Sequence, residues 1–96
     1  MPDYGFTYKG YKLYFTMKCL VEPMHAHVEE NYVQSKAAKI WIGENGRSKI
    51  QNPGKVPEKV LKEMQEWIKV NYEIMAEKWN VYGGGGFYAE IDEIEK

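Results

Sequence analysis

Cysteine is nearly absent from this chain of 96 residues, which contains only Cys19. A single cysteine cannot form an intrachain disulfide, so a reducing compartment fits the chain best. Long apolar runs are missing too: no stretch approaches the roughly 18 residues of a membrane span, and the first residues lack a signal-peptide pattern. We therefore expect a soluble, cytoplasmic protein with a single domain over residues 1–96, since chains of this length usually form one folding unit.

The chain also lacks a strong excess of one charge, because its net charge is only −1. Residues 1–56 carry eight Lys or Arg and five Asp or Glu, whereas residues 57–96 carry five and nine. Near neutrality is unsuited to strong non-specific DNA binding, which needs several phosphate contacts from a basic face. Helix salt bridges and an acidic tail explain the uneven distribution, and an anion facing the first part of the chain is the alternative.

Motifs of common catalytic centres are missing as well. Nothing supports a Ser/His/Asp triad or paired catalytic carboxylates, and Cys19 has no evident base partner. The glycine run at residues 83–86 follows a predicted helix and precedes no Lys-Ser/Thr, so it is not a phosphate-binding P-loop. We interpret it as a helix stop and hinge, with close approach to a ligand as the alternative. We expect no cofactor.

Histidine is scarce, but the only two histidines lie together within residues 23–28, Pro-Met-His-Ala-His-Val. Alternation of polar and apolar residues predicts a strand from about residue 24 to residue 29. On a strand, side chains two positions apart share a face. His25 and His27 should therefore project side by side, with the apolar residues between them filling the core.

The remaining pattern predicts an α+β fold, a small antiparallel sheet of three to four strands packed on one long helix. Residues 11–51 are mainly strands, with alternation at 11–18, 37–42 and 48–51, and residues 1–10 form a short strand or a flap. Asn-Gly at 45–46 predicts a type I′ hairpin turn, and Asn-Pro-Gly at 52–54 predicts a second turn.

A helix over residues 57–82 follows from apolar residues at intervals of three and four. The members of this stripe are Val60, Leu61, Met64, Trp67, Ile68, Met75, Trp79 and Tyr82. Val70 and Ile74 lie off the stripe and indicate a second contact, either with the C-terminal segment or within a homo-oligomer. Residues 87–96 are expected to form a short strand or a tail.

The candidate site is the sheet face that carries the two histidines. If the strands at 11–18 and 37–42 pair beside them, this exposed face also carries Lys12, Tyr14, Lys39 and Trp41. Cations can neutralise phosphates and ring faces can stack on a base. We therefore predict a non-catalytic binding protein for a phosphate-bearing ligand, most plausibly a nucleotide or RNA, with these four residues and the imidazoles as ligand-binding groups.

Three alternatives remain open for the histidine pair. The imidazoles could be structural, or they could hold a metal with Glu29 as a third ligand and with Cys19 or Glu22 approaching from the loop, since Zn sites usually need a fourth ligand. They could also act as acid and base in a metal-independent, toxin-like ribonuclease. A separate alternative concerns the whole protein, which could be an interaction module, an antitoxin or inhibitor, whose activity depends on Trp41 and not on the histidines.

The segments at residues 22–28 and 37–42, and the Gly-Lys-Val-Pro at 54–57 that opens the helix, resemble domain-of-unknown-function family 4160. These are small prokaryotic and phage proteins, and the likeness covers roughly residues 11–82. The resemblance implies a compact α+β fold and a phage–host or toxin–antitoxin setting, but no established activity. Many members carry a bulky residue where this chain has Ala26, and some have an additional upstream histidine where it has Val21-Glu22.

Overall fold

The computed structural model describes residues 3–16, 22–29 and 38–86. In these residues the chain forms five strands, a 3-10 turn at Glu44–Gly46 and one long helix. The bounds in chain order are β1 (Asp3–Tyr8), β2 (Tyr11–Tyr14), β3 (His25–Glu29), β4 (Ala38–Ile42), β5 (Ser48–Asn52) and α1 (Glu58–Val81).

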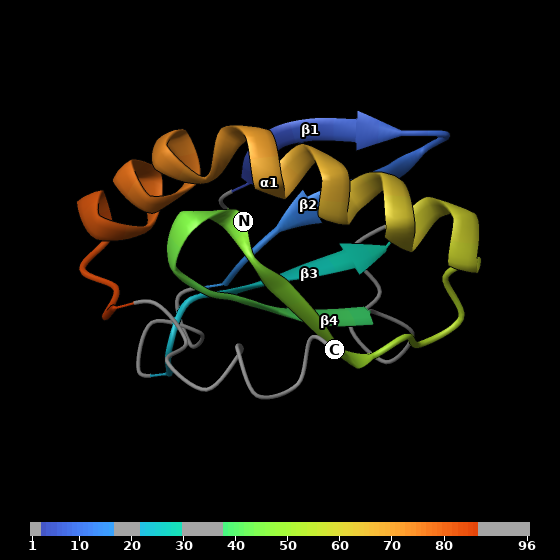
Figure 1. Cartoon of the computed structure of the whole chain (residues 1–96), viewed down its shortest axis with the longest axis horizontal. Coiled ribbons are helices and arrows are strands. Elements are labelled where there is room, and N and C mark those ends of the chain that lie inside the picture. Colours follow the sequence, from blue (N-terminus) through green and yellow to red (C-terminus); the bar gives the residue numbers. More distant parts are fainter. Residues whose placement is uncertain (1–2, 17–21, 30–37, 87–96) are drawn as a thin grey trace.

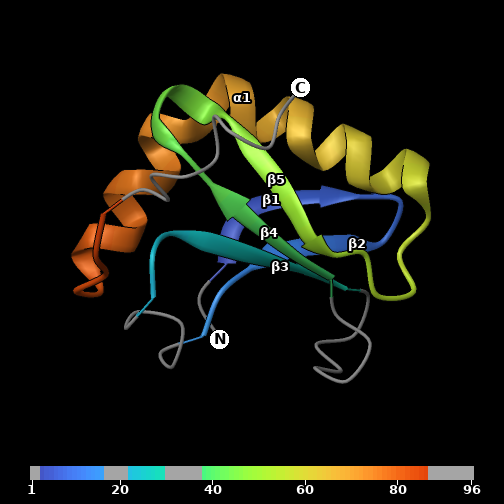
Figure 2. The same cartoon turned by 60° about the horizontal axis from the view of Figure 1, so that its bottom comes forward.

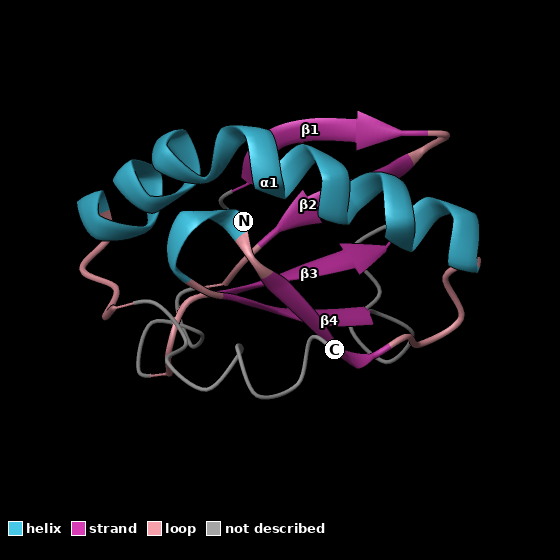
Figure 3. Cartoon of the chain, viewed as in Figure 1, coloured by secondary structure: helices cyan, strands magenta, loops and turns pink. Residues whose placement is uncertain are grey.

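The described strands form a single sheet in which each strand pairs with its sequence neighbours in antiparallel fashion, in the order β1-β2-β3-β4-β5 (Figure 3). The predicted α+β fold is confirmed, although the sheet has one strand more than the three to four expected. The extra strand is β1, where the sequence left a strand and a flap as equal choices. The central position of β3 puts both histidines in the middle of the sheet.

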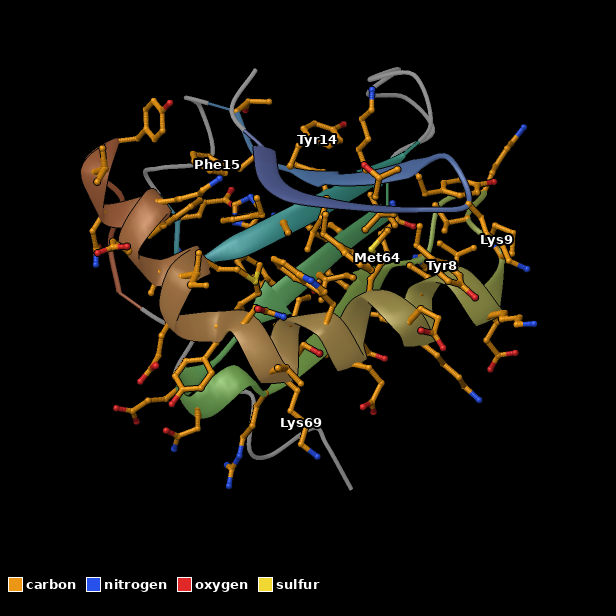
Figure 4. All side chains as sticks on the ribbon, turned by 90° about the horizontal axis from the view of Figure 1, so that it is seen from above. Tyr8, Lys9, Tyr14, Phe15, Met64 and Lys69 are labelled. Atoms are coloured by element: carbon orange, nitrogen blue, oxygen red, sulfur yellow. The ribbon has the colours of Figure 1, made fainter. Side chains whose placement is uncertain are left out.

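Helix α1 lies across one face of this sheet (Figure 1). Its buried side chains are Val60, Leu61, Met64, Ile68, Met75 and Trp79, all members of the predicted stripe. Figure 4 shows Met64 between α1 and the strands, whereas Tyr14 lies on the far side of the sheet. Burial of these apolar groups is the main favourable contribution to folding, at about 25 cal/mol per Å² of apolar surface.

Helix α1 changes direction near Asn71, whose φ of −116° and ψ of 18° are not helical. The Asn71 Nδ2 donates a hydrogen bond to the Trp67 carbonyl oxygen at 2.9 Å, one turn earlier. A side chain that bonds to the preceding turn in this way competes with the helix backbone and bends it. Figure 2 shows the C-terminal half of α1 turning down toward the start of β3.

The predicted Asn-Gly turn is present between β4 and β5. Asn45 and Gly46 have φ values of 65° and 82°, the positive values that a type I′ turn requires at its two central positions. A Cβ atom on Gly46 would lie 2.7 Å from the Cα and O atoms of Lys69. The turn therefore packs directly against the helix backbone, and only glycine fits there.

The glycine run stops α1 as predicted, with Gly83 at a φ of 91°. It is also anchored, because the indole Nε1 of Trp79 donates to the Gly85 carbonyl at 2.8 Å and the Met24 N–H donates to the Gly86 carbonyl at 2.9 Å. Its role as a hinge stays a prediction. The strand expected at 11–18 is shorter than predicted, because β2 ends at Tyr14 and residues 15–16 are not in a strand. Residues 17–18, Cys19 and residues 87–96 lie outside the described part of the chain.

None of the helices in the described residues has the length and apolar character needed to cross a bilayer.

Candidate functional site

The candidate site lies on the sheet face opposite α1, where the strand register lines up the predicted residues. Tyr14 pairs with His27, and His27 pairs with Lys39, so these three residues form one row across β2, β3 and β4. His25 pairs with Trp41 in a second row. The structure therefore brings together five of the six residues predicted to bind a ligand.

Lys12 belongs to the same face but to its other end. It pairs with the backbone of Glu29 in a third row, on the far side of His27 from Trp41. The side chain of Glu29 lies outside what the structure describes, so its proposed part in a metal site is untested. Within the described residues, no three His, Cys, Asp or Glu side chains are grouped so that they could hold one metal ion.

His25 is buried, with 1% of its surface exposed, and the expectation of an open imidazole is wrong for this residue. Its ring lies 5.3 Å from the Trp41 ring and 5.6 Å from the Trp79 ring, both in edge-on contact. Trp79 reaches this position because α1 bends at Asn71. The helix end thus encloses an imidazole that strand periodicity alone places in solvent.

Tyr14 is also buried, with 0% exposure, which corrects its expected position on an open face. Its ring lies 5.7 Å from the His27 ring at an interplanar angle of 38°. A buried ring cannot offer a free face to a base. Tyr14 therefore supports the position of His27 instead of stacking on a ligand.

His27 is the more accessible imidazole, being partly buried. Its Nδ1 lies 3.2 Å from the Ala38 carbonyl oxygen, and the His25 Nδ1 lies 2.9 Å from the Pro23 carbonyl oxygen. A carbonyl only accepts hydrogen bonds, so both Nδ1 atoms carry a proton and donate it. In each neutral ring the lone pair is then on Nε2, because one nitrogen donates and the other accepts.

Lys39 supplies the cation of the site. Its Nζ lies 4.3 Å from the centre of the Trp41 ring, within the range of a cation–π interaction, and 23% of its side chain is exposed. The Trp41 indole Nε1 donates to Gln51 Oε1 at 2.8 Å, which fixes the ring on β5. The cation–π contact with this fixed indole therefore holds the Lys39 ammonium in place.

Glu22 is the residue that the sequence analysis did not include among the ligand-binding groups. Its Oε1 accepts a hydrogen bond from Lys39 Nζ at 2.7 Å and lies 3.8 Å from His25 Nδ1. The bond from Lys39 holds the pKa of the Glu22 carboxyl below its ordinary value; partial desolvation opposes this, and the charge of Lys39 and of His25 and His27 adds to it. The sequence signal that concerns Glu22 is its position directly before Pro23, because a residue before proline favours extended backbone.

A separate groove of about 420 Å³ lies between the 3-10 turn and the middle of α1. Arg47, Lys69 and Glu66 line it together with polar groups. Both signs of charge are therefore present in its lining.

The histidine face thus consists of one accessible imidazole, one cation on an indole, and one carboxylate paired with that cation. No curated protein and no solved structure matches the chain. The family model described as "domain of unknown function (DUF4160)" matches residues 10–80, which include every described residue of this face. The chain therefore belongs to the DUF4160 family, as its resemblance to that family predicted.

Proposed function

We propose that this protein binds a phosphate-bearing ligand, most plausibly a nucleotide, on the face formed by His27, Lys39 and Trp41, without catalysing a reaction. The observation that carries the proposal is the Lys39 ammonium fixed 4.3 Å above the Trp41 ring, in register with His27. An ammonium and an imidazolium both donate to phosphate oxygens, and an indole beside them suits a base or a ribose.

The ion pair between Lys39 and the Glu22 carboxylate supports the choice of an anionic ligand, because it shows that the ammonium accommodates an anionic oxygen. The 2.7 Å contact between Lys39 Nζ and Glu22 Oε1 has the length of a charge-assisted hydrogen bond. An oxygen of a phosphate can take the place of this carboxylate oxygen, because both are anionic acceptors. His27, one strand away from Lys39, contributes a second contact through Nε2, which donates to a phosphate oxygen in the imidazolium form and accepts from a ribose hydroxyl in the neutral form.

The ribonuclease alternative receives less support from the geometry. Acid and base catalysis by the pair requires both imidazoles to reach the substrate, and His25 is 1% exposed. A binding role requires only His27, which is the accessible one. His25 then serves as a packed support for the site.

Isothermal titration calorimetry tests the binding proposal. The panel contains nucleoside mono-, di- and triphosphates and a short single-stranded RNA, with wild type, Lys39→Met and His27→Gln. We expect wild type to bind at least one member and each variant to bind it about tenfold more weakly, since a hydrogen bond to a charged group is worth about 1.5–3 kcal/mol.

Lys62→Met is the matched control, because Lys62 also forms an ion pair, with Glu58 at 3.8 Å, but on the exposed side of α1. Its affinity should equal that of wild type. The absence of heat with every member of the panel, for a folded sample, would defeat the proposal.

The setting and the assembly of the protein are proposed on separate grounds. The resemblance implied a phage–host or toxin–antitoxin context, in which a binder could sequester a signalling nucleotide, and the lone Cys19 suits the cytoplasm. A homo-oligomer is supported by an apolar stripe on the outer side of α1, where Val70 is 77% exposed, Ile74 53% and Val81 75%.

A further inference from the structure

We propose that Glu22 is a built-in competitor for the ligand phosphate: its carboxylate occupies the Lys39 ammonium in the ligand-free protein and leaves when phosphate binds. This inference rests on the proposed function of the same face. It assigns a regulatory and selective role to a residue that forms no part of the predicted site.

The Lys39 ammonium lies where the ring of Trp41 and the carboxylate of Glu22 meet. Its Nζ is held over the Trp41 ring at 4.3 Å, and Glu22 Oε1 lies 2.7 Å from it. A phosphate oxygen that approaches Lys39 on this side must take the position of the Glu22 oxygen. The two anions cannot both lie there, because like charges at that separation repel.

The two partners of the ion pair, Lys39 and Glu22, are anchored unequally. Lys39 lies within β4, and its side chain is 23% exposed, whereas the Glu22 side chain is 46% exposed. Glu22 precedes β3 in a bend and not in a strand. The cation therefore stays in place while the carboxylate can swing into solvent, at the modest cost of a partly exposed ion pair.

The displacement of Glu22 also affects selectivity. The net free energy that a ligand gains at Lys39 is the difference between its own interaction with the ammonium and that of the Glu22 carboxylate it displaces. A carboxylate ligand would exchange one singly charged anion for another and gain little. A phosphate monoester, with about two negative charges and three acceptor oxygens, gains a second contact with the imidazolium form of His27, whose Nε2 then donates, and can displace Glu22.

The experiment compares wild type, Glu22→Gln and Glu58→Gln by calorimetry, with inorganic phosphate, adenosine monophosphate and acetate as probes. Glu58→Gln removes the same charge from an exposed pair on α1 and controls for net charge. We expect Glu22→Gln to bind both phosphate probes about two- to fivefold more tightly than wild type, the factor of a partly exposed ion pair. Glu58→Gln should match wild type, and acetate should bind wild type more weakly than phosphate.

The outcomes separate the two proposals. If wild type binds phosphate but Glu22→Gln binds it no more tightly, or acetate binds as well as phosphate, the competitor role is overturned and the binding function stands. If neither protein binds any phosphate probe, the binding function fails and the competitor role fails with it. Binding by Glu22→Gln alone is the limiting case of a strong competitor and supports both.

Discussion

At the scale of single residues, the two histidines show what strand periodicity can and cannot determine. Alternation placed His25 and His27 on the same face, and their rings do lie 5.2 Å apart. It could not determine exposure, because His25 is covered by Trp79, which lies far along the chain and reaches the strand only through the fold. The contact of Glu22 with Lys39 was not predicted for the same reason, since Lys39 lies on β4 and meets Glu22 only through the fold.

Gly46 gives a stability prediction at this scale. We expect Gly46→Ala to lower the free energy of unfolding by more than about 1 kcal/mol, because it combines a positive φ with a Cβ position 2.7 Å from the Lys69 backbone. Urea denaturation measures the loss. Gly83→Ala is the control, since it has a φ of 91° but nothing within 4 Å of the added Cβ. Equal losses in the two variants would refute the close packing of the turn on α1.

Glu22 gives a pH prediction. Because its pKa in the folded protein lies below the ordinary 4.5, its ion pair stabilises the folded state above that pH and this contribution is lost as pH falls through the lowered pKa. At about pH 7, Glu22→Gln should therefore be less stable than wild type by at most about 1 kcal/mol, since the pair is partly exposed.

The measurement is chemical denaturation of both proteins at about pH 7 and at about pH 3. The difference between them should shrink at the lower pH, where the wild-type carboxyl begins to take up its proton. A difference that stays constant, or grows with acidity, would mean that the ion pair contributes nothing to folding.

At the scale of elements, the helix and the turns were the parts that the sequence predicted best. The stripe of apolar residues at intervals of three and four predicted α1 to within a residue at each end, because such a stripe reflects burial on one face. The fifth strand was uncertain because β1 is glycine-punctuated and aromatic, a composition that suits a flap equally. The bend at Asn71 depends on one side-chain hydrogen bond and leaves no periodic signal.

Trp79 gives the prediction for this scale. It is 1% exposed and contacts Phe15 at 5.2 Å as well as His25. We expect Trp79→Ala to cost about 3–5 kcal/mol of stability, the usual range for a buried tryptophan. Trp67→Ala should cost less, because Trp67 is only partly buried, against Phe6. Guanidinium denaturation compares the two, and a larger loss for Trp67→Ala would contradict the assignment of Trp79 as the link between helix and site.

At the scale of the whole molecule, α1 covers one face of the sheet, and the side of α1 that carries Val70, Ile74 and Val81 remains exposed. If the stripe of Val70, Ile74 and Val81 joins two copies, light scattering after size-exclusion chromatography should give twice the mass of one chain. Val70→Lys should then yield monomers, while Lys62→Glu, at an exposed position of α1 outside the stripe, should not. A monomeric wild type at all concentrations would exclude the homo-oligomer.

The hydrogen bond from Met24 to Gly86 has a consequence for synthesis. The ribosome makes β3 before it makes the glycine run, whose Gly86 carbonyl accepts the hydrogen bond from Met24, the residue directly before this strand. A nascent chain can form hairpins while it is still tethered to the ribosome, but His25 becomes covered only after Trp79 has been synthesised. A truncated product that ends before Trp79 would therefore lack the indole that contacts this imidazole.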